Sequence, residues 1–268
     1  MTTTFAAQRR QFSGRTSNKV PEVDVCFWIV KILCLTVGAS FAESVTAALG
    51  VGLDTTTVLF LAAFCGVLVF QLALDRHVPE AFWLTVTLAG ALAGLLCQIL
   101  TDEMRVAVSA GTVLLGLLLV AVLAAWRAQE HTLSLNSIRT PTRESFYWVA
   151  VLVSFALGAM ARTWAMASLG WTPLGSVLLP AALCAVVLLA RRGGVGLGVG
   201  LGAELIFWTG FTVTGPLGAD LGDWSRAARS DGGLGLGTGM TTGLFLMTIM
   251  MVLAYRGSRE RVPVGSDA

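Results

Sequence analysis

The feature that most constrains the fold is a series of eight apolar runs, each about as long as a membrane-spanning helix. They cover roughly residues 25–48, 55–75, 81–100, 106–126, 146–168, 173–190, 200–222 and 236–255. Hydrophobic residues make up 55% of the chain and charged residues only 13%, whereas soluble domains carry about 25% charged residues. Because almost no chain is left for a soluble domain, the sequence predicts an all-α integral membrane protein with eight transmembrane helices.

The distribution of Lys and Arg between the runs predicts the orientation. With the N-terminus inside, the outer loops hold only Arg105, Arg226 and Arg229, and most other cations lie on the inner side. Since cytoplasmic loops retain positive charge, both termini are predicted to be cytoplasmic. The polar residues 1–18 and 256–268 are expected to be disordered, which leaves a single membrane domain at residues 19–255.

An internal repeat is the most informative motif. An aromatic residue followed by Trp occurs at Phe27-Trp28, Phe82-Trp83, Tyr147-Trp148 and Phe207-Trp208. Ten residues after each Trp comes a small residue: Gly38, Ala93, Gly158 or Gly218. Fifteen residues after it comes Glu43, Gln98, Thr163 or Asp223. This constant spacing predicts four tandem copies, at about 19–76, 77–127, 139–192 and 193–255. Each copy holds two runs, so the copies are parallel helical hairpins that begin on the same side of the membrane.

Within each copy the two runs differ in polarity. The first carries Trp, small residues and occasional charges, and the second is almost uniformly apolar. Because polar groups in lipid must face protein or water, the odd-numbered helices are expected to form an inner ring and the even-numbered helices an outer wall. The four Trp residues are interpreted as part of an aromatic belt at the cytoplasmic interface.

A tier of polar residues is predicted toward the outer side of the membrane. The position fifteen after each Trp lies roughly 22 Å along its helix, at about 1.5 Å per residue. The candidate substrate- or ion-binding residues at this depth are Glu43, Asp223, Asp220, Gln98, Thr163 and Arg162. Two interpretations stay open: these residues bind a cation or carry a proton, or Arg162 pairs with Glu43 and Asp223 as a structural contact. Asp220 could instead reach the loop cations Arg226 and Arg229.

A second polar tier lies near the cytoplasmic helix starts. It comprises Asp24, Glu80, Glu144 and Glu204. An acid in the first turn of a helix caps free N–H groups and complements the helix dipole, so capping is the simpler interpretation and a cytoplasmic mouth the functional one. Lys31, one turn inside the first helix, is assigned to the same mouth because its side chain can snorkel to the interface.

Several function classes lack the motifs they need. No basic stripe suits nucleic acid, and there is no G-x-G-x-x-G, G-x-S-x-G or H-E-x-x-H motif, so neither an enzyme nor a cofactor is evident. The expected partners are the lipid bilayer and a small ion or solute. A bound cation is compatible with the acids, while any metal and the oligomeric state are unknown from sequence.

Three segments resemble a known family. They are "KVPEVDVCFWIVKI", "FYWVAVLVSFALG" and "GPLGADLGD", and they are similar to bacterial and archaeal multi-pass proteins called uncharacterised membrane-anchored proteins, which are built from four tandem repeats of unknown function. The resemblance covers residues 19–255 and is loose in the second copy. It implies a bacterial inner-membrane location and supplies no substrate.

The acidic positions depart from the family pattern. Ala39 stands at the family's Glu, Glu43 at its first Asp, and Gln98 and Thr163 at the acids of the second and third copies, so only Asp223 matches. Tight divalent-ion binding normally needs several oxygen ligands with enough negative charge. Because this chain keeps only part of the acidic set, tight binding of a divalent ion is not expected. We expect a small membrane transport protein for a cation or a proton-coupled solute, with a non-transporting membrane scaffold or sensor as the alternative.

Overall fold

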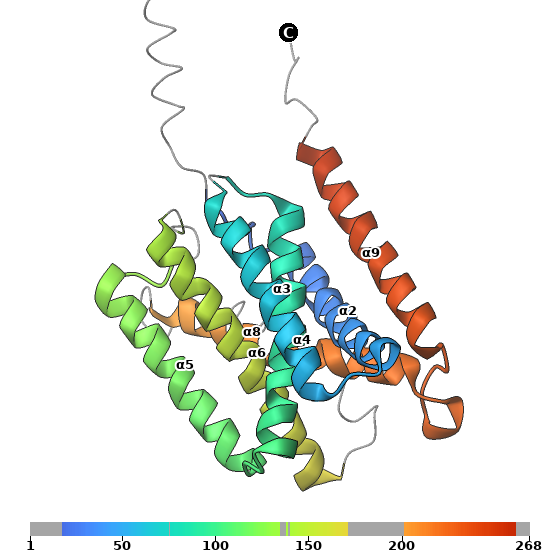
Figure 1. Cartoon of the computed structure of the whole chain (residues 1–268). Helices are drawn as coiled ribbons and strands as arrows, with labels where there is room; N and C mark the ends of the chain where they lie inside the picture. The colour runs from blue at the N-terminus through green and yellow to red at the C-terminus, as the bar shows by residue number, and fades with distance from the viewer. Residues whose placement is uncertain (1–17, 75, 135–137, 139, 171–200, 261–268) are drawn as a thin grey trace, which may run out of the picture.

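A computed structural model describes residues 18–74, 76–134, 138, 140–170 and 201–260, and these residues form helices and connecting loops without a strand (Figure 1). The long helices are α2 (Val25–Leu49), α3 (Leu53–Ala73), α4 (Pro79–Gln98), α5 (Val108–Glu130), α6 (Pro141–Leu169), α8 (Leu201–Arg226) and α9 (Gly237–Glu260). A π-helical turn, η1 (Ile99–Glu103), extends α4, and a 3-10 turn, η3 (Arg229–Asp231), follows α8. The predicted run at residues 173–190 lies outside the described residues.

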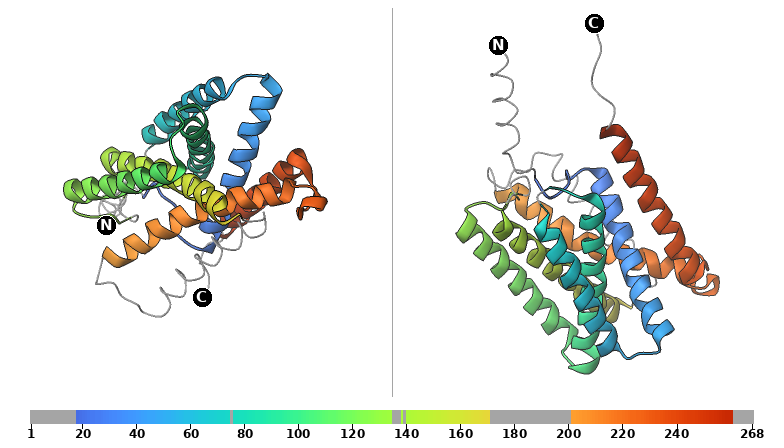
Figure 2. Two further views of the ribbon diagram at one scale, coloured as in Figure 1. Left: turned by 90° about the horizontal axis from the view of Figure 1, so that it is seen from below. Right: turned by 45° about the horizontal axis from the view of Figure 1, so that its top comes forward.

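Six of these helices are long and apolar enough to cross a membrane, namely α2, α3, α4 with η1, α5, α6 and α9. Helix α8 is less apolar because Pro216 and several Thr and Gly residues lie between its charged ends. Figures 1 and 2 show α8, in orange, crossing the other helices at a steep angle. The described helices are thus compatible with a multi-pass membrane protein.

Local chemistry explains where several helices begin and end. The Asp24 side chain accepts a hydrogen bond of 2.8 Å from the backbone N–H of Phe27 and caps α2, as predicted for this acid. Helices α4 and α6 have Pro79 and Pro141 in their first turn, where the missing N–H of proline costs no helical hydrogen bond. Gly50 ends α2 in the left-handed conformation, which glycine adopts without a steric penalty.

Helices α2, α4, α6 and α8 form a closed ring of contacts. Helix α2 packs against α4 and α8, and α6 packs against the same two helices. Around this ring, α3 packs mainly on α4, α5 on α6, and α9 on α2. Helices α3 and α5 therefore each pack on the first helix of the following predicted copy. Helix α9, in the last copy, packs on the first helix of the first copy. The two described helices of one predicted copy contact each other less than they contact helices of the neighbouring copies.

The outer helices expose large apolar side chains. Examples on α3, α5 and α9 are Val69, Phe70, Val113, Leu117, Met247 and Met251. Apolar patches of this extent are unfavourable in water, whereas the hydrocarbon core of a bilayer accommodates them. The exposure thus agrees with lipid surrounding these three helices.

In three of the four predicted copies, the small residue ten positions after Trp lies where two ring helices approach closely. A Cβ atom on Gly38 would lie 2.6 Å from the Thr87 carbonyl oxygen, and one on Gly218 would lie 2.6 Å from that of Ile32. A Cβ on Gly158 would lie 2.8 Å from the Thr212 carbonyl oxygen. Small residues of this kind allow helix backbones to pack closely in membrane proteins.

The predicted aromatic belt is wrong for three of the four repeated Trp residues. Trp83, Trp148 and Trp208 are buried in the helix ring. The aromatic residue before one Trp packs against the Trp of the next copy. Phe82 lies 5.4 Å from Trp148 and Tyr147 lies 6.1 Å from Trp208, measured between ring centroids. A belt residue must face lipid, but these rings lie on the faces of the ring helices that point inward, so they form an aromatic core.

Candidate functional site

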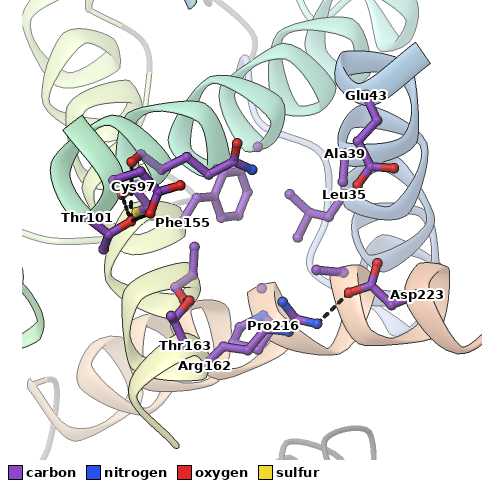
Figure 3. A pocket seen from close by; sticks show the side chains of 17 residues that line it. Leu35, Ala39, Glu43, Cys97, Thr101, Phe155, Arg162, Thr163, Pro216 and Asp223 are labelled. Atoms are coloured by element: carbon purple, nitrogen blue, oxygen red, sulfur yellow. Dashed lines mark hydrogen bonds and ion pairs between the residues drawn. The ribbon is translucent and has the colours of Figure 1, made fainter. Parts of the chain in front are cut away.

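A cavity of about 330 Å³ lies among α2, α4, α6 and α8. Its walls repeat the internal register of the sequence, because each helix contributes the residues seven, eleven and fifteen positions after its Trp. The three tiers are Leu35, Gly90, Phe155 and Gly215; Ala39, Gly94, Ala159 and Ala219; and Glu43, Gln98, Thr163 and Asp223. Figure 3 shows side chains of this wall coming from all four helices.

The two inner tiers are apolar and mostly small. The Leu35 side chain lies against Gly90, where an added Cβ would come within 2.3 Å of Leu35 Cδ2. On the other side of the ring, Phe155 stacks on Phe211 with 5.2 Å between ring centroids. The cavity therefore has a polar rim and an apolar floor, and Phe211 joins this floor to the aromatic core through its contact with Trp208.

Five charged residues at the rim form a continuous network. Arg162 on α6 donates hydrogen bonds to Asp220 and Asp223 on α8. Arg226, in the last turn of α8, donates to the other oxygen of Asp223 and to Glu43 on α2. The order Asp220, Arg162, Asp223, Arg226, Glu43 alternates in charge and links three ring helices. Helix α4 completes the tier with the neutral amide of Gln98.

The exposure of the three carboxylates rises along this network. The Asp220 side chain is 1% exposed and Arg162 is 21% exposed, whereas Asp223 and Glu43 are 43% and 58% exposed. Charges attract more strongly where water is excluded, and ion pairs at exposed positions contribute little net stability. The Arg162–Asp220 pair is therefore the strong end of the network, and the Arg226–Glu43 pair is the weak end.

The structure brings the predicted outer-tier residues to one place. Five of the six line the cavity, and the sixth, Asp220, binds Arg162 behind the wall. The expected partners are wrong in two respects. Glu43 pairs with Arg226 rather than with Arg162, and Asp220 pairs with Arg162 rather than with the loop cations. The reason is helical phase: Asp220 and Asp223 both face α6, while Arg226 lies one turn past Asp223.

Sequence reasoning missed three residues at this end of the molecule. Arg226 was treated as a loop cation, although its spacing of three from Asp223 places the two side chains on one helix face. Thr101 and Asp102 also line the cavity, and the Thr101 hydroxyl donates a 2.9 Å hydrogen bond to Asp102. Their location depends on the π-helical turn after Gln98, which no motif indicated.

The acids of the second predicted tier lie at helix starts, away from the cavity lining. Glu80 and Glu204 occupy the first turns of α4 and α8. Glu144 is buried and forms a 2.7 Å ion pair with Lys19, and Gln71 donates to its other oxygen at 3.2 Å. Structural roles therefore account for Asp24 and Glu144, and a cytoplasmic mouth stays a prediction.

The expected snorkelling of Lys31 is wrong. Its side chain is fully buried, and its Nζ donates to the Phe211 carbonyl and the Thr214 hydroxyl of α8. The same atom lies 3.9 Å from the centroid of the Phe211 ring, a cation–π geometry. Lys31 thus joins α2 to α8 below the cavity, because its side chain points into the ring rather than toward the interface.

Metal ligation is not evident in the described part of the chain, where His, Cys, Asp and Glu form no group of three that could hold an ion. The three rim carboxylates already bind guanidinium groups. A cation that entered the rim would therefore compete with arginine for its oxygen ligands.

Comparison with known proteins adds one finding. A family model described as "Repeat of Unknown Function (DUF347)" matches residues 26–77 and again residues 206–261. These stretches hold α2 with α3 and α8 with α9, which belong to the first and fourth predicted copies. No curated protein and no solved structure matches the chain. The chain is thus similar in two places to a repeat whose function is unknown.

Proposed function

We propose that this chain is an inner-membrane transport protein in which the cavity binds a small cation or a proton-coupled solute. The observation that carries the proposal is that four helices present the same three positions to a single cavity with a charged rim. Ionisable residues within membrane helices are costly and rare, and in many membrane proteins they mark a substrate or ion pathway. In the orientation predicted from Lys and Arg, the cavity lies toward the outer side of the membrane.

The proposal includes eight helices in four parallel repeats. Its support is the constant spacing after Trp, the two matches to one repeat model, and the close approaches at Gly38, Gly158 and Gly218. In each of these approaches a glycine meets the residue four positions after Trp in the neighbouring copy. The eighth span is the predicted run at residues 173–190.

The rim chemistry favours a positive charge. Its network contains three carboxylates and two guanidinium groups, and Asp102 adds a further acid to the lining. A cation that binds between Glu43 and Asp223 would take over oxygen atoms from Arg226. Because these pairs are substantially exposed, the exchange costs little, and it would loosen the contact between α2 and α8. Substrate binding could in this way alter the packing of the ring.

A flux measurement tests the proposal. Purified protein in liposomes is given gradients of protons, sodium, potassium, magnesium, manganese or zinc, and wild type is compared with Asp223→Asn and Gly94→Leu. A Cβ on Gly94 meets no atom within 4 Å, so the leucine would fill the cavity while leaving every charge in place. Both variants are expected to abolish flux.

The matched control is Gly66→Leu on α3, where an added Cβ also meets no atom within 4 Å and the residue is exposed on the outer surface. This variant should transport like wild type. Wild-type flux that survives both cavity variants would contradict the proposal. The alternative is a non-transporting scaffold or sensor, and its support is the ion-pair network that links α2, α6 and α8. Folded and inserted protein that transports none of these ions would favour this alternative.

A further inference from the structure

A second space adjoins the cavity between α2 and α4. It measures about 390 Å³ and shares Ala39, Glu43, Gly90, Gly94 and Gln98 with the first. The rest of its lining is almost entirely apolar, with Leu53 and Leu95 as the largest side chains. Among the described residues that line it, Glu43 is the one charged group. Glu43 therefore lies between a polar cavity and an apolar side space.

The charge at this position is incompletely balanced. Glu43 and Asp223 both bind Arg226, and Asp223 also binds Arg162 together with Asp220, so three carboxylates share two guanidinium groups at the rim. Glu43 is 58% exposed whereas Arg226 is 11% exposed. A ligand can thus reach the carboxylate without first displacing the buried part of the arginine. A single positive charge would complete the pairing.

The neighbouring groups do not suit a hard metal ion. Calcium takes six to eight oxygen ligands and magnesium takes six in a near-octahedral arrangement. Around Glu43 the side space offers the Gln98 amide and the Thr46 hydroxyl, and in the described part of the chain the Glu43 carboxylate belongs to no group of three His, Cys, Asp or Glu that could hold a metal ion. The other wall residues are Ala, Gly and Leu. An apolar group of a ligand that packs against such a wall is removed from water, and this burial favours binding.

Taking the proposed transport function as its basis, we propose that the ligand is a small organic monocation, an ammonium group attached to an apolar body. Its charge binds at Glu43, and its body lies against Ala39, Gly94 and Leu95 in the side space. Two spaces of a few hundred cubic ångströms each fall in the range that small-molecule sites occupy.

Equilibrium binding to the purified full-length protein tests this inference independently of flux. The probe is radiolabelled benzyltrimethylammonium, whose charge is permanent. The competitors are tetramethylammonium, which has the charge with little apolar body; benzyl alcohol, which has the body without the charge; and manganese. We expect benzyltrimethylammonium to bind at least about tenfold more tightly than each of them, because it alone uses both the carboxylate and the apolar wall.

Variants locate the site. Glu43→Gln is expected to weaken binding about tenfold or more, Glu43→Asp to keep most of it, and Gly94→Leu to abolish it, while Gly66→Leu binds like wild type. Thermal unfolding of each variant shows that it is folded. Equal displacement by manganese or benzyl alcohol, or binding that ignores both Glu43→Gln and Gly94→Leu, would overturn the inference. Asp223-dependent ion flux without benzyltrimethylammonium binding would overturn it and leave the transport proposal standing.

Discussion

Arg162 and Arg226 both hold carboxylates at the cavity rim, but their surroundings differ. Arg162 neutralises Asp220, which is 1% exposed, while the two partners of Arg226 are about half exposed. Removing one member of a buried pair leaves an uncompensated charge and costs about 3–5 kcal/mol. An exposed pair contributes about 0–1 kcal/mol. The two arginines should therefore differ sharply in their effect on stability.

We expect Arg162→Leu to lower the thermal unfolding temperature in detergent far more than Arg226→Leu. The double variant Arg162→Leu with Asp220→Asn should recover much of the loss, because it removes the buried carboxylate together with its partner. Equal effects of the two single variants, or a double variant as unstable as Arg162→Leu, would contradict this ranking of the network.

The sequence predicted which residues lie together around the cavity, but it did not predict which charged residues form ion pairs. The constant spacing after Trp placed Glu43, Gln98, Thr163 and Asp223 in one tier, and the structure finds them around one cavity. Pairing depends on differences of a few ångströms between side-chain ends, and these follow from helix rotation and tilt. Gly222, for example, lies where α8 comes close to α2, since an added Cβ would lie 2.9 Å from Thr36 Cγ2.

Among the helices, the glycine contacts set how closely the ring can pack. A Cβ on Gly218 would lie 2.6 Å from the Ile32 carbonyl oxygen and 2.9 Å from Leu35 Cβ. A backbone oxygen cannot move aside as a flexible side chain can, so the two helices would have to separate. Overpacking of this kind typically costs about 1–3 kcal/mol.

Gly218→Ala is therefore expected to lower the unfolding temperature measurably. The control is Gly116→Ala on α5, where the nearest atom to an added Cβ is Leu157 Cδ1 at 4.0 Å; alanine's higher helix propensity should leave that variant unchanged or slightly more stable. If Gly218→Ala is as stable as Gly116→Ala, the close approach between α8 and α2 is not a stabilising contact.

The helices and their inner ring could be predicted from the sequence, but the packing partners of the outer helices could not. Seven predicted runs coincide with described helices, and six of these helices are long and apolar enough to cross a membrane. The runs of α3 and α5 are apolar on all faces, so nothing in them indicates which partner they pack against. The repeated Trp residues were misread for a related reason: an aromatic residue near a helix end suits a lipid interface and a buried core equally well.

On the scale of the whole molecule, we infer that the polar ends of four ring helices enclose one site that water can reach. The ring closes through α8 and α2, and α9 packs on the first helix, so the site draws residues from both halves of the chain. The periodic sequence predicted a ring, whereas the cavity and its side space depend on glycines and alanines whose role emerges only from their packing.

Thiol labelling tests this claim most directly. In a variant whose five native cysteines are replaced, Gly94→Cys, Gly66→Cys and Met104→Cys are each treated in oriented vesicles with a membrane-impermeant, charged thiol reagent. Met104 lies in the loop after η1 and is 62% exposed, so it marks the side of the membrane on which the cavity opens. Because a thiol reacts as its thiolate and needs water to ionise, Gly66→Cys should stay unlabelled in lipid. We expect Gly94→Cys to react from the same side as Met104→Cys. A folded Gly94→Cys protein that reacts from neither side of the membrane would contradict a water-accessible site.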